Sequence, residues 1–189
     1  MIKIGILGDI GSGKSFIAKT FGYPVFNADK EVSKIYKENK KVFIELKKVL
    51  PNYIRSFPIN KNEITKAILA NKINLKKIID IVHLEVRKNM NFFLKKNKNK
   101  KIVILDIPLL LENKINNKKD ILVFVDSKNK DIVKRLKKRR NFNRSLLNKF
   151  KKIQIDSGYK KKKAQYIIKN NFTKKPVRES INKIINEIL

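Results

Sequence analysis

Eight consecutive residues near the start of the chain could hold the phosphates of a nucleotide. They match the phosphate-binding pattern G-x-x-x-x-G-K-[ST] without a mismatch. Glycines allow such a loop to curl so that its N–H groups point inward at phosphate oxygens. Lys14 is expected to reach the β- and γ-phosphates, and the Ser15 hydroxyl is expected to ligate Mg²⁺. The pattern predicts binding of a nucleoside triphosphate by Gly8, Asp9, Ile10, Gly11, Ser12, Gly13, Lys14 and Ser15.

The elements on either side of this loop are the ones that such a site needs. Residues 2–7 are mostly apolar and read as a short strand, and residues 16–21 continue the chain as a helix. The N-terminus of that helix adds partial positive charge beside the loop. Phe16 opens the helix and is included in the predicted nucleotide site.

Two aspartates are candidates for the chemistry next to the phosphates. Asp29 is predicted to end the second strand, where ligands bind in α/β sheets. There it could accept a proton from an attacking hydroxyl, or it could serve as the N-cap of a helix over residues 30–39; both interpretations stay open. Asp106 follows four apolar residues and ends the third strand, an arrangement that would place a carboxylate near Mg²⁺ or its waters.

His83 and Arg87 form a second candidate group. They lie four residues apart, so a helix would present both on one face, where they could hold a phosphorylated substrate. His83 is the only histidine of the chain, and a lone histidine is more often a structural hydrogen-bonding group.

Four arginines follow the strand that ends at Asp126, in a chain that otherwise prefers lysine. Their planar guanidinium groups bind phosphate in a bidentate manner, so the segment is interpreted as a lid that closes over ATP, in preference to a solvated basic face. Ser127 is the expected N-cap of the helix that carries the first of them. The four arginines are Arg135, Arg139, Arg140 and Arg144.

The hydrophobic pattern predicts an α/β class. Residues 2–7, 102–106 and 121–126 read as buried parallel strands, with weaker candidates at 24–27 and 166–168. Helical spacing in residues 40–100 predicts an insertion between the second and third strands. We therefore expect a doubly wound parallel sheet with a core over about 1–39, 101–130 and 160–189, a helical substrate-binding insertion over about 40–100 and a small lid over about 131–159.

The composition narrows the classes of partner. The formal net charge is +31, but the lysines are spread along the whole chain, and no aromatic residues that could stack on bases alternate with them. This pattern favours compositional drift over a nucleic-acid role as the origin of the charge. The sequence has no cysteine and no run of eighteen apolar residues, so we expect a cytoplasmic protein without a membrane span.

Taken together, these residues resemble the dephospho-CoA kinases, a family of P-loop kinases with a three-layer sandwich fold. The phosphate loop is generic, but the His-containing segment at 81–87 and the Pro-Leu-Leu-x-Glu segment at 106–112 are more specific. Gln154, Lys160, Ala164, Ile168 and Asn170 fall at the spacing of the family's closing segment. The chain departs from the family at Leu84, Gln165 and Phe172, where the family has proline, an acidic residue and glycine. An arginine of the family is also replaced near Asn62.

The resemblance implies Mg²⁺- and ATP-dependent phosphorylation of the ribose 3′-hydroxyl of dephospho-CoA. It implies that Asp29 orients or deprotonates that hydroxyl, and that Arg139 or Arg140, with Arg144, neutralises developing charge. It also implies that the acceptor is bound by Asp29, His83, Arg87, Asp106, Pro108 and Leu109. The expected partners are small molecules, with no specific nucleic acid and no membrane, and the expected state is a monomer or weak homo-oligomer. The alternatives are another small-molecule P-loop kinase, acting on a nucleotide or sugar acid, and a nucleic-acid-binding ATPase.

Overall fold

In the part of the chain that the structure describes, the sheet contains five parallel strands in the order β2-β3-β1-β4-β5. They span Ile2–Gly8 (β1), Val25–Asn27 (β2), Ile102–Asp106 (β3), Ile121–Asp126 (β4) and Tyr166–Lys169 (β5). In the central strand, Ile4 is in register with Ile104 on one side and Ile121 on the other. The predicted α/β class with a parallel sheet is therefore confirmed, including the two weaker strand candidates.

The computed structural model describes residues 1–138 and 142–189, and these divide into two compact units. The first unit contains Met1–Asn27, Asn97–Asn143 and Phe150–Leu189, and so holds the whole sheet. The second contains Ala28–Lys96 and Arg144–Lys149. The division into core, insertion and lid that the sequence suggests stays a prediction.

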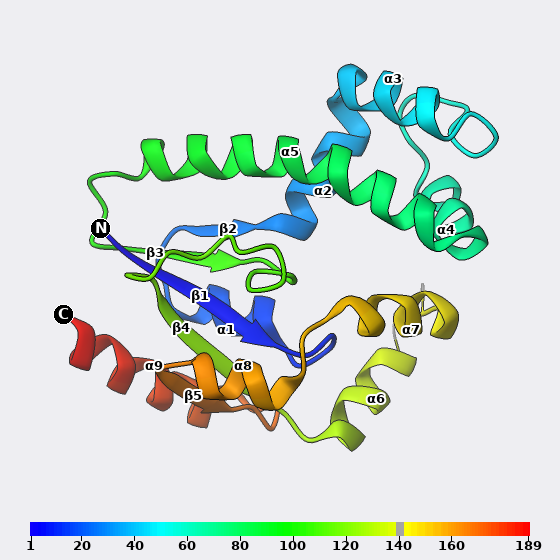
Figure 1. Cartoon of the computed structure of the whole chain (residues 1–189). Coiled ribbons are helices and arrows are strands. Elements are labelled where there is room, and N and C mark those ends of the chain that lie inside the picture. The colour runs from blue at the N-terminus through cyan, green and yellow to red at the C-terminus, as the bar shows by residue number, and fades with distance from the viewer. Residues whose placement is uncertain (139–141) are drawn as a thin grey trace. The chain divides into compact units, whose positions relative to one another are not determined.

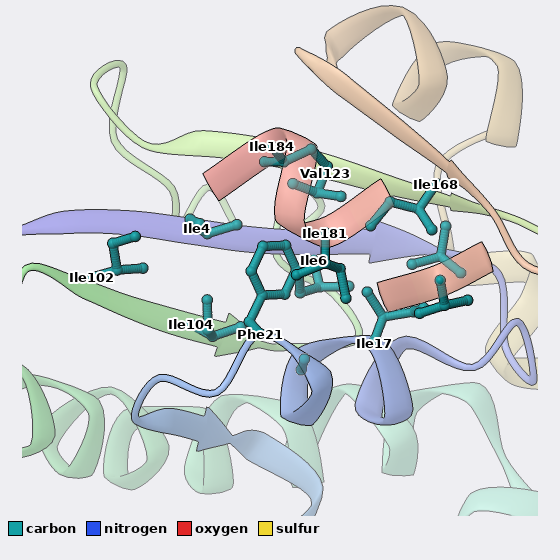
Figure 2. Close-up of a cluster of buried hydrophobic side chains, with 13 residues drawn as sticks. Ile4, Ile6, Ile17, Phe21, Ile102, Ile104, Val123, Ile168, Ile181 and Ile184 are labelled. Atoms are coloured by element: carbon teal, nitrogen blue, oxygen red, sulfur yellow. The ribbon is translucent and has the colours of Figure 1, made fainter. Parts of the chain in front are cut away.

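The core of the first unit forms between the sheet and two helices, α1 (Lys14–Thr20) and α9 (Lys174–Ile188). Figure 2 shows Ile17 of α1, Phe21 directly after that helix, and Ile181 of α9 among the isoleucines of the strands. Side chains alternate along a strand, so Ile4 and Ile6 point into this cluster while Gly5 points the other way, where an added Cβ would lie 2.5 Å from Leu110. This unit also contains α6 (Asn129–Lys137) and α8 (Ser157–Lys163).

The second unit is helical. It contains α2 (Ala28–Glu38), α3 (Lys40–Val49), α4 (Lys61–Ala70) and α5 (Lys72–Lys96), and α7 (Arg144–Ile153) begins in it (Figure 1). The long helix α5 packs against α2, α3 and α4 through buried residues at helical spacing, among them Ile78, Val82 and Val86. None of the helices that the structure describes combines the length and the apolar character needed to cross a membrane.

Two local predictions are wrong. β2 ends at Asn27, and α2 begins one residue later, so Asp29 lies inside the first turn of α2 and is neither the end of a strand nor an N-cap. Ser127 does not cap α6, whose N-cap is Lys128. Its hydroxyl instead donates to the carbonyl oxygen of Ser12 at 2.9 Å, a long-range contact that local sequence cannot indicate.

Candidate functional site

The predicted phosphate loop joins the end of β1 to the start of α1. Gly13 is the N-cap of α1 and has a left-handed backbone, with φ of +97°. A Cβ at this position would lie 2.4 Å from Nδ2 of Asn170, so both the backbone angle and the packing require glycine. The loop therefore leads into a helix whose first N–H groups have no carbonyl partner within that helix. Such groups form an anion-binding site.

Lys14 lies over the backbone of this loop. Its Nζ donates to the carbonyl oxygen of Gly8 at 2.9 Å and to that of Asp9 at 2.8 Å. These bonds hold a largely buried ammonium group beside the loop N–H groups, so positive charge and amide donors gather at one place. This is the arrangement needed to hold a polyphosphate.

Ser15 and Asp106 are connected through Asn27, the last residue of β2. The Asn27 Nδ2 donates to Asp106 Oδ2, and it lies 3.5 Å from Ser15 Oγ. Asp106 is 2% exposed, whereas the Ser15 side chain is exposed. Asn27 was not among the predicted site residues, yet it links the carboxylate of β3 to the hydroxyl of α1.

A hydroxyl and a carboxylate oxygen in one network are hard ligands of the kind that Mg²⁺ prefers. Within the described ranges, no cluster of three or more His, Cys, Asp or Glu side chains could hold a metal by itself. The Ser15 hydroxyl and the Asp106 carboxylate still suit Mg²⁺, because this ion binds few protein ligands and keeps water and phosphate oxygens as its other ligands.

The side chain of Asn170 holds the backbone of the phosphate loop. It follows β5, is 2% exposed, and its Nδ2 donates to the carbonyl oxygen of Ser12 at 2.8 Å. Ser127 donates to the same oxygen. Two side chains from the ends of β4 and β5 thus fix the position of Ser12, directly before Gly13.

Arg135 also lies beside the loop. Its guanidinium stacks on the Phe172 ring, with Cζ 4.1 Å from the ring centroid, and a Cβ at Gly13 would lie 3.4 Å from its Nη1. Phe172 has a φ of +67°, in the region that favours glycine, which is the residue usual here in the family that the sequence resembles. Arg139 and Arg140 lie outside the described residues.

A buried ion pair was missed by the sequence analysis. Lys160 of α8 lies 2.9 Å from Glu112, and Glu112 also accepts from the backbone N–H of Ile155 at 3.0 Å. Gln154 donates to the carbonyl oxygen of Pro108 at 3.4 Å. Pro108, Leu109 and Glu112 lie in the turns after β3, so these contacts attach those turns to the segment that leads into α8.

The remaining predicted residues belong to the second unit. Asp29 is exposed in the first turn of α2, and its carbonyl oxygen accepts from the Ser33 hydroxyl at 2.9 Å. His83 and Arg87 lie on α5, and Arg144 is the first residue of α7. Burial lowers the pKa of His83 below its usual 6.5 and the charge of Arg87 lowers it further, while Asp80 acts in the opposite direction.

Comparison with known proteins points to the family that the sequence resembles. The family model described as dephospho-CoA kinase matches residues 2–175. A protein from Wolbachia pipientis wMel named dephospho-CoA kinase is 32% identical over 190 residues, covering 98% of this chain and 97% of that protein.

Two solved structures are similar to this chain in fold. TT1252 from Thermus thermophilus has a TM-score of 0.80 and 26% identity, with 100% of this chain and 97% of that chain covered. A dephospho-CoA kinase from Campylobacter jejuni has a TM-score of 0.61 and 24% identity over 98% of this chain and 96% of that chain, which supports the fold. Since the family model covers most of the sequence, the chain belongs to the dephospho-CoA kinase family.

Proposed function

We propose that this protein transfers the γ-phosphoryl group of ATP to the ribose 3′-hydroxyl of dephospho-CoA, giving coenzyme A and ADP. The observation that carries the proposal is the phosphate loop with Lys14 held over it, in a chain of the dephospho-CoA kinase family. The further details, a cytoplasmic enzyme acting as a monomer or weak homo-oligomer, follow from the sequence expectations.

In this proposal the loop binds the β- and γ-phosphates. The N–H groups at the start of α1 and the Lys14 ammonium face the negative charge that grows on the phosphoryl oxygens during transfer. Lys14 exchanges its contacts with the carbonyl oxygens of Gly8 and Asp9 for contacts with phosphate. Because the loop is fixed by Asn170 and Ser127, little reorganisation is needed at the moment of reaction.

Ser15 would hold Mg²⁺ through its hydroxyl, with Asp106 near enough in the Asn27 network to accept hydrogen bonds from metal-bound water. When bound, the ion neutralises phosphate charge and orients the β- and γ-phosphates. Asn27 would keep the Asp106 carboxylate oriented for this purpose.

Asp29 would accept the proton of the attacking 3′-hydroxyl, or orient that hydroxyl for in-line attack. Its exposed position in the first turn of α2 leaves the carboxylate accessible to a substrate. His83 and Arg87 would bind the acceptor, together with Asp106, Pro108 and Leu109. Arg139 or Arg140, with Arg144, would neutralise charge on the transferred group.

The test is an acceptor panel. Purified protein is incubated with Mg-ATP and dephospho-CoA, and ADP and coenzyme A are measured together. Parallel reactions contain AMP, CMP, gluconate or single-stranded DNA in place of dephospho-CoA. We expect ADP and coenzyme A in equal amounts with dephospho-CoA alone. ADP formed only with another acceptor would reject the substrate assignment while keeping the phosphate site, and hydrolysis stimulated by DNA would indicate a nucleic-acid-binding ATPase.

A further inference from the structure

An acidic side chain stands inside the phosphate loop. Asp9 is the first variable residue of the G-x-x-x-x-G-K-[ST] pattern, next to Gly8 and five residues before Lys14. A carboxylate at this position weakens phosphate binding by the loop, because its negative charge repels a polyphosphate. The structure shows how that side chain is held: Asp9 Oδ1 accepts a hydrogen bond from the hydroxyl of Ser157, the first residue of α8.

An unattached Asp9 carboxylate would also compete for the loop's own donors. Aspartate side chains commonly accept from the N–H two residues further along the chain, which here belongs to Gly11. That N–H is one of the groups that a phosphate-binding loop turns toward its anion. The carbonyl oxygen of Asp9 already accepts from the Ser12 N–H at 3.1 Å, so the backbone turn that favours such a side-chain bond is present.

The helix that carries Ser157 is firmly attached to the first unit. One turn further along α8, the buried Lys160 pairs with Glu112 at 2.9 Å. Lys161 pairs with Asp126, at the end of β4, at 2.8 Å. Asp156 caps the helix by accepting from the Tyr159 N–H at 3.1 Å. Ser157 therefore donates from a fixed position and can restrain a side chain of the neighbouring loop.

We propose that Ser157 is a positioning residue that keeps the Asp9 carboxylate away from the loop amides, so that phosphate can occupy them. Loss of the Ser157 hydroxyl releases a negative charge into the phosphate site. Loss of the Asp9 carboxylate removes the need for Ser157. The two side chains are thus coupled in their effect on nucleotide binding, and the sign of that coupling is fixed: removing Asp9 repairs the damage caused by removing Ser157.

The experiment measures the Kd of Mg-ATP by titration calorimetry, without an acceptor, for the parent chain and for Ser157→Ala, Asp9→Ala and the double variant. Losing one restraining hydrogen bond corresponds to about 1 kcal/mol, so we expect Ser157→Ala to weaken binding about fivefold. The double variant should bind Mg-ATP as tightly as Asp9→Ala does, because the Ser157 hydroxyl has nothing to restrain once the carboxylate is gone. The defect of Ser157→Ala should shrink at high salt, since a released charge is screened.

Ser180→Ala is the matched control, because Ser180 also donates its hydroxyl to one oxygen, the carbonyl of Pro176, but lies on α9. Parental binding in Ser157→Ala, or a defect that Asp9→Ala does not repair, contradicts the inference. The inference rests on the nucleotide site of the proposed function but not on its acceptor. Variants that follow this pattern in a chain that makes no coenzyme A would support the inference and reject the proposed function.

Discussion

Lys160 and Glu112 form an ion pair at 2.9 Å in which both side chains are almost completely buried. Breaking such a pair by removing one partner leaves an uncompensated buried charge, whereas removing both leaves an apolar interior. We predict that Lys160→Met destabilises the protein by about 3–5 kcal/mol in urea unfolding, and that the double variant Lys160→Met/Glu112→Leu recovers much of this loss. A double variant no more stable than Lys160→Met would contradict that account of the pair.

Lys14 is predicted to act on catalysis with little effect on folding. Lys14→Ala removes the ammonium that faces the phosphates, so kcat should fall by about tenfold or more. The melting temperature should stay close to that of the parent, because the loss of the hydrogen bonds to Gly8 and Asp9 is offset by the removal of a largely buried charge. Lys19→Ala, an exposed position on the same helix, is the control. Equal turnover in Lys14→Ala and Lys19→Ala would remove the role assigned to Lys14.

Asp29 is predicted to affect turnover more than binding. Asp29→Asn keeps the size of the side chain and removes its ability to take a proton, so kcat should fall by about tenfold or more with the KM for dephospho-CoA little changed. Glu31→Gln is the control, since Glu31 lies in the same first turn of α2 and its oxygen still accepts from Asn89. Parental kcat in Asp29→Asn would show that the proton is taken elsewhere.

Gly13 and Gly22 separate the effect of packing from that of backbone angle. Both have positive φ, +97° and +76°, but a Cβ at Gly13 meets Asn170 at 2.4 Å while a Cβ at Gly22 meets nothing within 4 Å. We expect Gly22→Ala to cost only the backbone strain of about 1–2 kcal/mol. Gly13→Ala should cost more and also abolish Mg-ATP binding, as calorimetry would show. Comparable losses in both variants would mean that the contact with Asn170 does not shape the loop.

Stability should depend on pH through His83. Its pKa is lowered in the folded protein, chiefly by burial, so the unfolded chain binds the proton more readily. The stability that neutral His83 contributes to the folded protein is therefore fully present above pH 6.5. It is lost as the pH falls through the lower pKa that His83 has in the folded state. Melting temperature measured between pH 7.5 and pH 5 should fall less steeply in His83→Gln than in the parent. Identical slopes would show that His83 does not contribute.

The sequence was sufficient for the features that depend on local patterns. Continuous apolar runs identified the strands, and the glycine loop could be recognised between β1 and α1 because its residues are adjacent in the chain. Helical spacing in residues 40–100 found α3, α4 and α5. The sequence could not give the exact end of β2, because Ala28 and Asp29 suit both a strand end and a helix start.

Long-range contacts were the features that the sequence could not supply. The hydroxyls of Ser127 and Ser157 find partners more than a hundred residues away, and only the folded sheet brings them together. Lys160 opens a run of four lysines, and the sequence marked it as the exception to a solvated face, but its burial against Glu112 is seen only in the folded chain. Asn27 carried no chemical signal, and its role follows only from the pairing of β2 with β3.

The most direct test of the proposed reaction follows the phosphate itself. Protein is incubated with γ-³²P-ATP, Mg²⁺ and dephospho-CoA, and the labelled product is treated with a 3′-specific nucleotidase. We predict that the label appears in coenzyme A, that the nucleotidase releases it completely, and that Lys14→Ala forms far less product. Label that stays out of coenzyme A, or that resists the 3′-specific nucleotidase, would contradict phosphorylation of the ribose 3′-hydroxyl.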